Sequence, residues 1–224
     1  MRVLHVARNL KGRDYAVGDI HGHTSRLFSR LREVGFNPDS DRLFSVGDLV
    51  DRGPECVQAV ELVDQPWFYA VRGNHDDFAI QHLREQCVDE LLYRMNGGDW
   101  FLDAPASVQE AVVRRLETLP FAIQVPTAAG NIGIVHADIP WGSWDDLEIR
   151  LQREDRRELV MWSRMRVTLR NTSKVAGIDH LVVGHNRLRE PLVLGNVHHI
   201  DTGGWRESGD GRFCLLNLDT MAPV

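Results

Sequence analysis

Five short polar blocks, each directly after a stretch of apolar residues, constrain this chain more than any other feature of its sequence. They begin at residues 18, 47, 73, 135 and 183 and read GDIHG, GDLVDRG, GNHD, VHAD and VGHN. The apolar stretches are short and rich in Val, Ile, Leu and aromatic residues, which is typical of buried strands. Because the carboxyl ends of strands line the ligand crevice in open α/β sheets, we expect the five blocks to meet at one site.

The first part of the chain alternates strand and helix patterns. Strand-like residues 15–17, 43–46 and 67–71 are separated by a helical pattern over 27–34, which Gly35 ends, and by a second helix that Pro54 begins. The first residues, including His5, are expected to form a tail. A β-α-β-α-β alternation predicts parallel strands joined by right-handed crossovers.

The remainder of the chain is predicted to add a helical segment and more strands. Residues 76–119 have helical patterns with a turn at Asn96-Gly97-Gly98, and residues 145–164 form a charged helical stretch. Further strands are expected at 121–125, 132–135, 181–183, 192–194, 197–200 and 213–218. The predicted class is α/β, with two sheets packed together and helices outside. Since no repeat or linker divides the sequence, we expect one domain over 1–224, with a helical rim at roughly 76–119.

The composition is that of an ordinary globular protein and limits the classes of partner that it can bind. Hydrophobic residues make up 43% of the 224 residues, and no apolar run approaches the roughly 20 residues that cross a bilayer. A net charge of −6 disfavours nucleic acid, but not a phosphorylated substrate, because bound metal ions reverse the local field. The odd set Cys56, Cys87 and Cys214, without a secretion signal, predicts reduced, buried thiols in a cytoplasmic protein with no membrane partner.

The residue types in the blocks favour a divalent metal site. Carboxylate, imidazole and amide groups without thiolate suit Mn, Fe, Zn or Ni. Asp19 and His21 are two residues apart, so in extended backbone their side chains point the same way and share one ion. Asp48 has two oxygens and can bridge two ions, which lie roughly 3.5–4 Å apart in such sites. We expect the second ion to be completed by Asn74, His136 and His185.

The same blocks supply groups for proton transfer and for phosphate binding. His75, next to Asn74, is predicted to be a general acid that protonates the departing alkoxide, while Asp51 holds its imidazole. A metal-bridging hydroxide would attack phosphorus in line. The forked guanidinium groups that match phosphate are those of Arg52, Arg72 and Arg164.

Taken together, the blocks resemble the calcineurin-like metallophosphoesterase superfamily. Within it, nearly the whole chain is similar to the bacterial and bacteriophage lambda-type protein-serine/threonine phosphatases. The resemblance implies a sandwich of two mixed β-sheets flanked by helices, two metal ions, usually Mn, and hydrolysis of phosphoserine, phosphothreonine and often phosphotyrosine or aryl phosphates. It assigns the same roles by position: Asp19, His21 and Asp48 to one ion, Asp48, Asn74, His136 and His185 to the other, His75 and Asp51 to the acid pair, and Arg52, Arg72 and Arg164 to phosphate.

The sequence also leaves alternatives open. His23, Asp76 and Asn186 differ from residues frequent in those phosphatases, and near the cleft they would alter substrate choice. One rival function is hydrolysis of dinucleoside polyphosphates or nucleotides on the same scaffold. The other is a metal-binding interaction module without catalysis, which the His75–Asp51 pair disfavours, since a binder has no use for a general acid.

Overall fold

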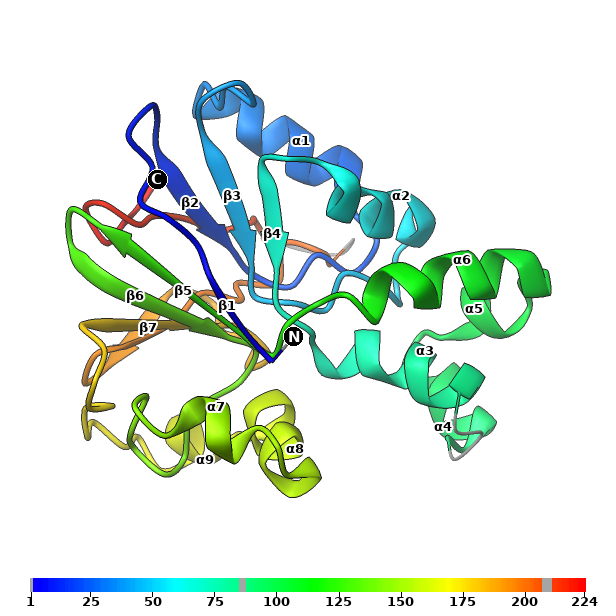
Figure 1. Cartoon of the computed structure of the whole chain (residues 1–224). Coiled ribbons are helices and arrows are strands. Elements are labelled where there is room, and N and C mark those ends of the chain that lie inside the picture. The colour runs from blue at the N-terminus through cyan, green and yellow to red at the C-terminus, as the bar shows by residue number, and fades with distance from the viewer. Residues whose placement is uncertain (1, 85–87, 207–210) are drawn as a thin grey trace.

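The computed structural model describes residues 2–84, 88–206 and 211–224, and within them two β-sheets lie face to face with helices outside (Figure 1). The five-stranded sheet has the order β11-β10-β2-β3-β4 and the six-stranded sheet the order β1-β5-β6-β7-β9-β8. The strands are β1 (Val3–His5), β2 (Asp14–Val17), β3 (Arg42–Ser45), β4 (Phe68–Ala70), β5 (Ala122–Thr127), β6 (Gly130–Val135), β7 (His180–Val183), β8 (Leu192–Leu194), β9 (Val197–His199), β10 (Leu215–Asn217) and β11 (Ala222–Pro223).

The helices cover the outer faces of both sheets (Figure 1). Those of the first half are α1 (Thr24–Glu33), α2 (Cys56–Glu61), α3 (Asn74–Arg84), α4 (Glu90–Met95), α5 (Asp99–Leu102) and α6 (Ala106–Leu116). They pack with one core cluster against the five-stranded sheet, through Leu27, Val60 and Leu116 among others. The helices α7 (Leu147–Arg150), α8 (Glu154–Trp162) and α9 (Met165–Thr168) lie beside the six-stranded sheet, and α7 and α8 share a second cluster with it.

Side chains that alternate along the strands form a third apolar cluster between the two sheets. Ala16 and Phe44 of one sheet meet Ile123, Ile134 and Val182 of the other there, and none of these five is exposed. Their sequence neighbours point to the opposite faces, as the period of two requires. The mixed α/β class with two sheets and flanking helices is therefore confirmed, and β2, β3 and β4 are parallel as predicted.

Most predicted elements lie within a few residues of the observed ones, but the N-terminus and the charged stretch differ from the prediction, and α9 and β11 were not predicted. The N-terminal segment is not a tail: β1 pairs in parallel with β5, Val3 opposite Ala122 and His5 opposite Gln124. The pattern gave no signal because a three-residue edge strand acquires its partner from far along the chain. The charged stretch 145–164 divides into α7 and α8 rather than forming one helix.

The two cysteines of the described residues, Cys56 and Cys214, are free and buried, as expected, while Cys87 lies outside the described residues. Across residues 2–84, 88–206 and 211–224, no helix is both long and apolar enough to span a membrane.

Candidate metal centre

The polar blocks meet where strands of both sheets end. Asp48 follows β3, His136 follows β6 and His185 follows β7, and all three side chains are buried. The turns are tight: Asp48 and His185 have φ angles of 52° and 60°, in the left-handed region. Gly73 and Gly184 allow close approach, because a Cβ at either position would strike the carboxylate of Asp48 or of Asp19, respectively.

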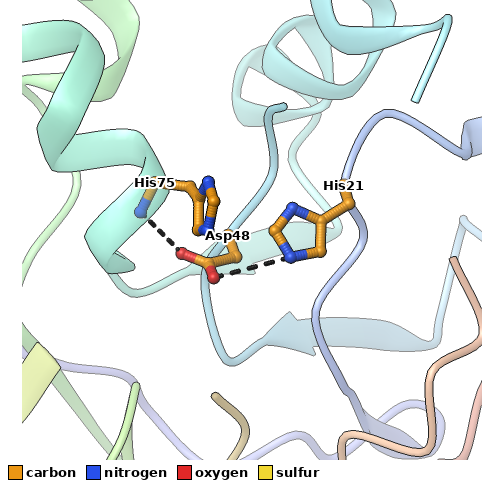
Figure 2. A group of neighbouring side chains, drawn as sticks. All are labelled: His21, Asp48 and His75. Atoms are coloured by element: carbon orange, nitrogen blue, oxygen red, sulfur yellow. Dashed lines mark hydrogen bonds and ion pairs between the residues drawn. The ribbon is translucent and has the colours of Figure 1, made fainter. Parts of the chain in front are cut away.

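Asp48 lies at the centre of the site and belongs to two groups that could hold a metal ion. In one, it meets His21 and His75 (Figure 2); in the other, it meets His136 and His185. Its Oδ2 lies 3.7 Å from Nε2 of His21 and 3.4 Å from Nε2 of His136. Its Oδ1 accepts a hydrogen bond from the backbone N–H of His75 at 2.9 Å.

The remaining predicted ligands, Asn74 and Asp19, lie on the His136–His185 side. Oδ1 of Asn74 is 3.0 Å from Nε2 of His136. Oδ1 of Asp19 accepts the backbone N–H of His185 at 3.1 Å. The structure therefore brings all six predicted ligand residues to one place, but it groups His75, rather than Asp19, with His21 and Asp48.

Backbone carbonyls orient the histidine rings. Nδ1 of His21 lies 2.8 Å from the carbonyl oxygen of Val50, and Nδ1 of His136 lies 2.7 Å from that of Val46. An Nδ1–H donated to a carbonyl turns Nε2 inward as a free electron pair, which is the usual arrangement of metal-binding histidines. In His185, Nε2 is buried and has no hydrogen-bond partner among the described residues. This donor set fits a divalent cation.

Burial and crowding perturb the charges at this site. Burial, and then the charges of Asp201 and Asp48, raise the pKa of Asp19 well above its ordinary value. Burial and then His136 lower the pKa of His185 to about 3. For His136 itself, burial acts downward but Asp48 prevails and raises the pKa to about 9. Such crowded, buried carboxylates and imidazoles are typical of functional sites, and a cation would relieve the repulsion between the carboxylates.

The predicted acid pair forms beside the metal centre. Nδ1 of His75 lies 2.7 Å from Oδ2 of Asp51, and both side chains are buried. The other oxygen of Asp51 accepts the indole N–H of Trp100 at 2.8 Å and the hydroxyl of Tyr93 at 3.4 Å. Burial raises the pKa of Asp51 despite the hydrogen bond from His75. With Nδ1 committed to Asp51, Nε2 of His75 faces the site.

The three predicted phosphate-binding arginines have different positions. Arg52 reaches into the centre, where its Nη1 and Nη2 lie 2.6 and 2.7 Å from Nε2 of His21 and of His75, and its guanidinium stacks on Trp205 at 4.7 Å. Arg164 donates to the carbonyl oxygen of His185 at 3.3 Å.

Arg72 is directed away from the other two. Its guanidinium pairs with Asp77 at 3.3 Å, donates to the carbonyl oxygen of Glu117 at 3.1 Å and lies over the Phe121 ring. It lines a separate small cavity of about 100 Å³ between α3 and α8, together with Glu154. These contacts brace the fold, so a phosphate-binding role for Arg72 stays a prediction without support from its position.

Two residues that the sequence placed near the cleft have bracing positions instead. Asp76 is fully buried and accepts the backbone N–H groups of Asp48, Leu49 and Gly73, each at 2.9 Å. His23 is buried and bonds the carbonyl oxygen of His21 at 2.6 Å. Three loop N–H groups converging on one carboxylate fix the turn that carries Asp48. No local signal in the sequence distinguishes this role from substrate contact.

Buried carboxylates and imidazoles, without thiolates, lie together at the strand ends of a two-sheet sandwich. Because these groups are ligands for divalent cations, the fold and the site define an α/β protein that uses divalent metal ions. The calcineurin-like phosphoesterase family matches residues 15–208, and the chain belongs to this family, so it is a phosphoester hydrolase.

Three known proteins show how the similarity is distributed. Serine/threonine-protein phosphatase 1 of Salmonella typhimurium is 39% identical over 192 residues, 84% of this chain and 85% of that protein. A symmetrical bis(5'-nucleosyl)-tetraphosphatase of Pseudomonas syringae is 34% identical over 133 residues, 56% of this chain and 41% of that protein. The solved metallophosphoesterase of Sphaerobacter thermophilus shares the fold, with a TM-score of 0.59 at 20% identity over 96% of this chain and 88% of that chain.

Proposed function

We propose that this protein removes phosphate from phosphoserine and phosphothreonine residues of proteins, using two divalent ions, Mn by preference. The observation that supports this proposal most directly is the position of Asp48, whose carboxylate belongs to both groups of side chains that could hold a metal ion. In this proposal one ion is held by Asp19, His21 and Asp48, and the other by Asp48, Asn74, His136 and His185.

When bound, the two ions supply Lewis-acid polarisation of the phosphoryl group and lower the pKa of a coordinated water. The chain's own arginines then hold the substrate. Arg52 enters the centre between His21 and His75, so its fork can take two phosphate oxygens. Arg164, at the start of α9, lies beside His185 and can contact the same phosphate.

His75 donates the proton that the departing alkoxide needs. Its Nδ1–H is fixed on Asp51 at 2.7 Å, which leaves Nε2 as the atom that faces the leaving oxygen. Serine and threonine alkoxides are poor leaving groups, so this proton transfer is a large part of the rate. Asp51 orients the ring by accepting the Nδ1–H of His75.

An open cleft beside the centre supports a peptide substrate. It encloses about 800 Å³, and its walls include Phe78, Leu92 and Trp162. Phe78 and Trp162 reach the centre edge-on, with ring centroids 5.9 Å from His75 and 6.0 Å from His185. The cleft also carries Asp155, Glu158 and Arg164. Apolar walls next to the centre suit a polypeptide, whose side chains can pack against them.

The similarity to protein phosphatases over most of both chains also supports this substrate class. A second candidate, hydrolysis of dinucleoside polyphosphates, is supported by the partial similarity to bis(5'-nucleosyl)-tetraphosphatases. We place the reaction in the cytoplasm, because Cys56 and Cys214 are free thiols, which persist in reducing compartments.

One assay series separates the candidates. Phosphate release is measured from phosphoserine and phosphothreonine peptides and from diadenosine tetraphosphate, with Mn, Zn, Ni or Mg added to chelator-treated protein. We expect the highest kcat/KM with a phosphopeptide and Mn. A kcat/KM at least tenfold higher for diadenosine tetraphosphate would replace the proposal with the second candidate.

A further inference from the structure

The helical rim touches the acid pair directly. We infer that residues 93–100, here called the rim clamp, position Asp51 for catalysis, and that Trp100 is the principal positioning residue. The inference rests on the proposed function, because it requires His75 to act as general acid with Asp51 as its partner. It gives a role to the Asn96-Gly97-Gly98 turn, which no step of the proposed reaction uses.

The first observation is that the two oxygens of Asp51 have different hydrogen-bond donors. Oδ2 takes Nδ1 of His75 at 2.7 Å, whereas Oδ1 takes Trp100 at 2.8 Å and Tyr93 at 3.4 Å. A carboxylate held through only one oxygen rotates about its χ2 angle, which is a broad torsion. The two rim donors remove that freedom and hold Oδ2 toward the imidazole.

The second observation concerns the backbone next to Asp51. Asp51 and Arg52 both have φ angles of 70°, a strained conformation for residues with a Cβ. The N–H of Arg52 donates to the carbonyl oxygen of Gly97 at 3.2 Å. Gly97 itself has a φ angle of 92°, and a Cβ there would meet the Arg52 backbone at 2.6 Å. The turn therefore lies directly on the strained segment and stabilises it.

The third observation is that the rim clamp is itself anchored. Tyr93 and Phe101 are fully buried in the core cluster, with ring centroids 6.2 Å apart. Gly98 makes room for the Tyr93 ring, which a Cβ would strike. At the start of α4, the side chain of Asp89 accepts the N–H of Leu92 at 2.9 Å and caps the helix. The donors are thus presented from a fixed support.

Asp51 is not exposed, so in the native protein its oxygens are satisfied by protein donors and not by solvent. Removing the indole N–H leaves Oδ1 with the longer contact to Tyr93 alone. The carboxylate can then adopt a second orientation, so the hydrogen bond between Oδ2 and Nδ1 of His75 is formed in a smaller fraction of molecules. The fall in kcat should depend on how much the leaving group needs a proton. This need is large for an alkyl phosphate and small for an activated aryl phosphate.

The test is the ratio of two kcat values, one for a phosphoserine peptide and one for p-nitrophenyl phosphate, measured with Mn. Trp100→Phe keeps the aromatic packing and removes the N–H; we expect it to lower the ratio about tenfold. Tyr93→Phe removes the longer contact and should lower the ratio by about two- to threefold. The matched control is Trp141→Phe, which removes an indole hydrogen bond of 2.8 Å to the carbonyl oxygen of Ser143 and should keep the wild-type ratio.

His75→Asn serves as the reference for the proposed function. If His75→Asn lowers the ratio but Trp100→Phe and Tyr93→Phe leave it at the wild-type value, the positioning role is overturned while the proposed function stands. If His75→Asn does not lower the ratio, the proposed general acid itself is wrong. A loss of stability in Trp100→Phe lowers both kcat values together and leaves the ratio unchanged, so it cannot imitate the expected result.

Discussion

Nε2 of His136 lies 3.4 Å from Oδ2 of Asp48, although the two residues follow strands of different sheets. Asp48 follows β3 of the five-stranded sheet and His136 follows β6 of the six-stranded sheet. The metal centre is therefore built across the interface between the sheets, and the packing between them sets the geometry of the site. Four predictions follow from this arrangement and from its surroundings.

Replacing the shared carboxylate should weaken both proposed ions together. In Asp48→Asn we expect metal affinity to fall by more than the roughly 10–100-fold that loss of a supporting partner costs, because a ligand atom common to both groups is removed. Metal content after dialysis, measured by elemental analysis, checks this. Asp39→Asn, an exposed carboxylate, is the control and should keep wild-type content. Full metal content in Asp48→Asn would contradict the shared role.

Replacing the acid should reduce turnover without emptying the metal centre. In His75→Asn we expect kcat for a phosphoserine peptide to fall by about 10²–10⁴-fold, since proton donation to the alkoxide is lost. The metal content should stay within error of the wild type, because the proposal gives His75 no ligand role. Normal turnover of the peptide by this variant would refute the assignment.

A buried ion pair under the His136 loop should contribute strongly to stability. Nε of Arg166 donates to Asp138 at 2.8 Å, and both side chains are only 4% exposed. In Arg166→Met the carboxylate is left buried and uncompensated, so the free energy of unfolding should drop by about 3–5 kcal/mol. Arg153→Met breaks an exposed pair with Asp155 and should leave the free energy of unfolding close to the wild-type value. Urea unfolding of both variants provides the measurement; equal effects would contradict the difference in burial.

A buried histidine outside the metal centre should make stability depend on pH. Burial and then Arg166 lower the pKa of His199 to about 4, and neither ring nitrogen has a partner among the described residues. The unfolded chain, with an ordinary pKa near 6.5, binds the proton more tightly. This contribution is therefore complete above pH 6.5 and is lost as the pH falls toward 4, by roughly 2 kcal/mol between pH 7.5 and 5.

His199→Leu removes that proton uptake, so its free energy of unfolding should fall less steeply over the same interval. Urea unfolding of chelator-treated wild type and variant at pH 7.5 and pH 5 measures the difference. The same pH dependence in both proteins would show that His199 does not titrate in this way.

The sequence predicted the parts of this protein that depend on local pattern. Strand-length apolar stretches, the glycines after them and the polar residues that follow are all encoded within a few positions, so β2, β3, β4 and the site-bearing turns were predicted together. The helical rim was also predicted, because its apolar periodicity is local. The three-residue β1 was missed, since its pairing with β5 depends on residues far along the chain.

Tertiary structure decided how the polar groups are divided among tasks. In sequence, Arg52 and Arg72 are equivalent forked donors after strands, yet one reaches the metal centre and the other pairs with Asp77. Asp76 and Asp51 are both acidic residues of the blocks, but one fixes backbone N–H groups and the other holds His75. Residue type and local spacing determine which chemistry is available, while packing between distant segments determines which partner each group meets, and that cannot be deduced from neighbours along the chain.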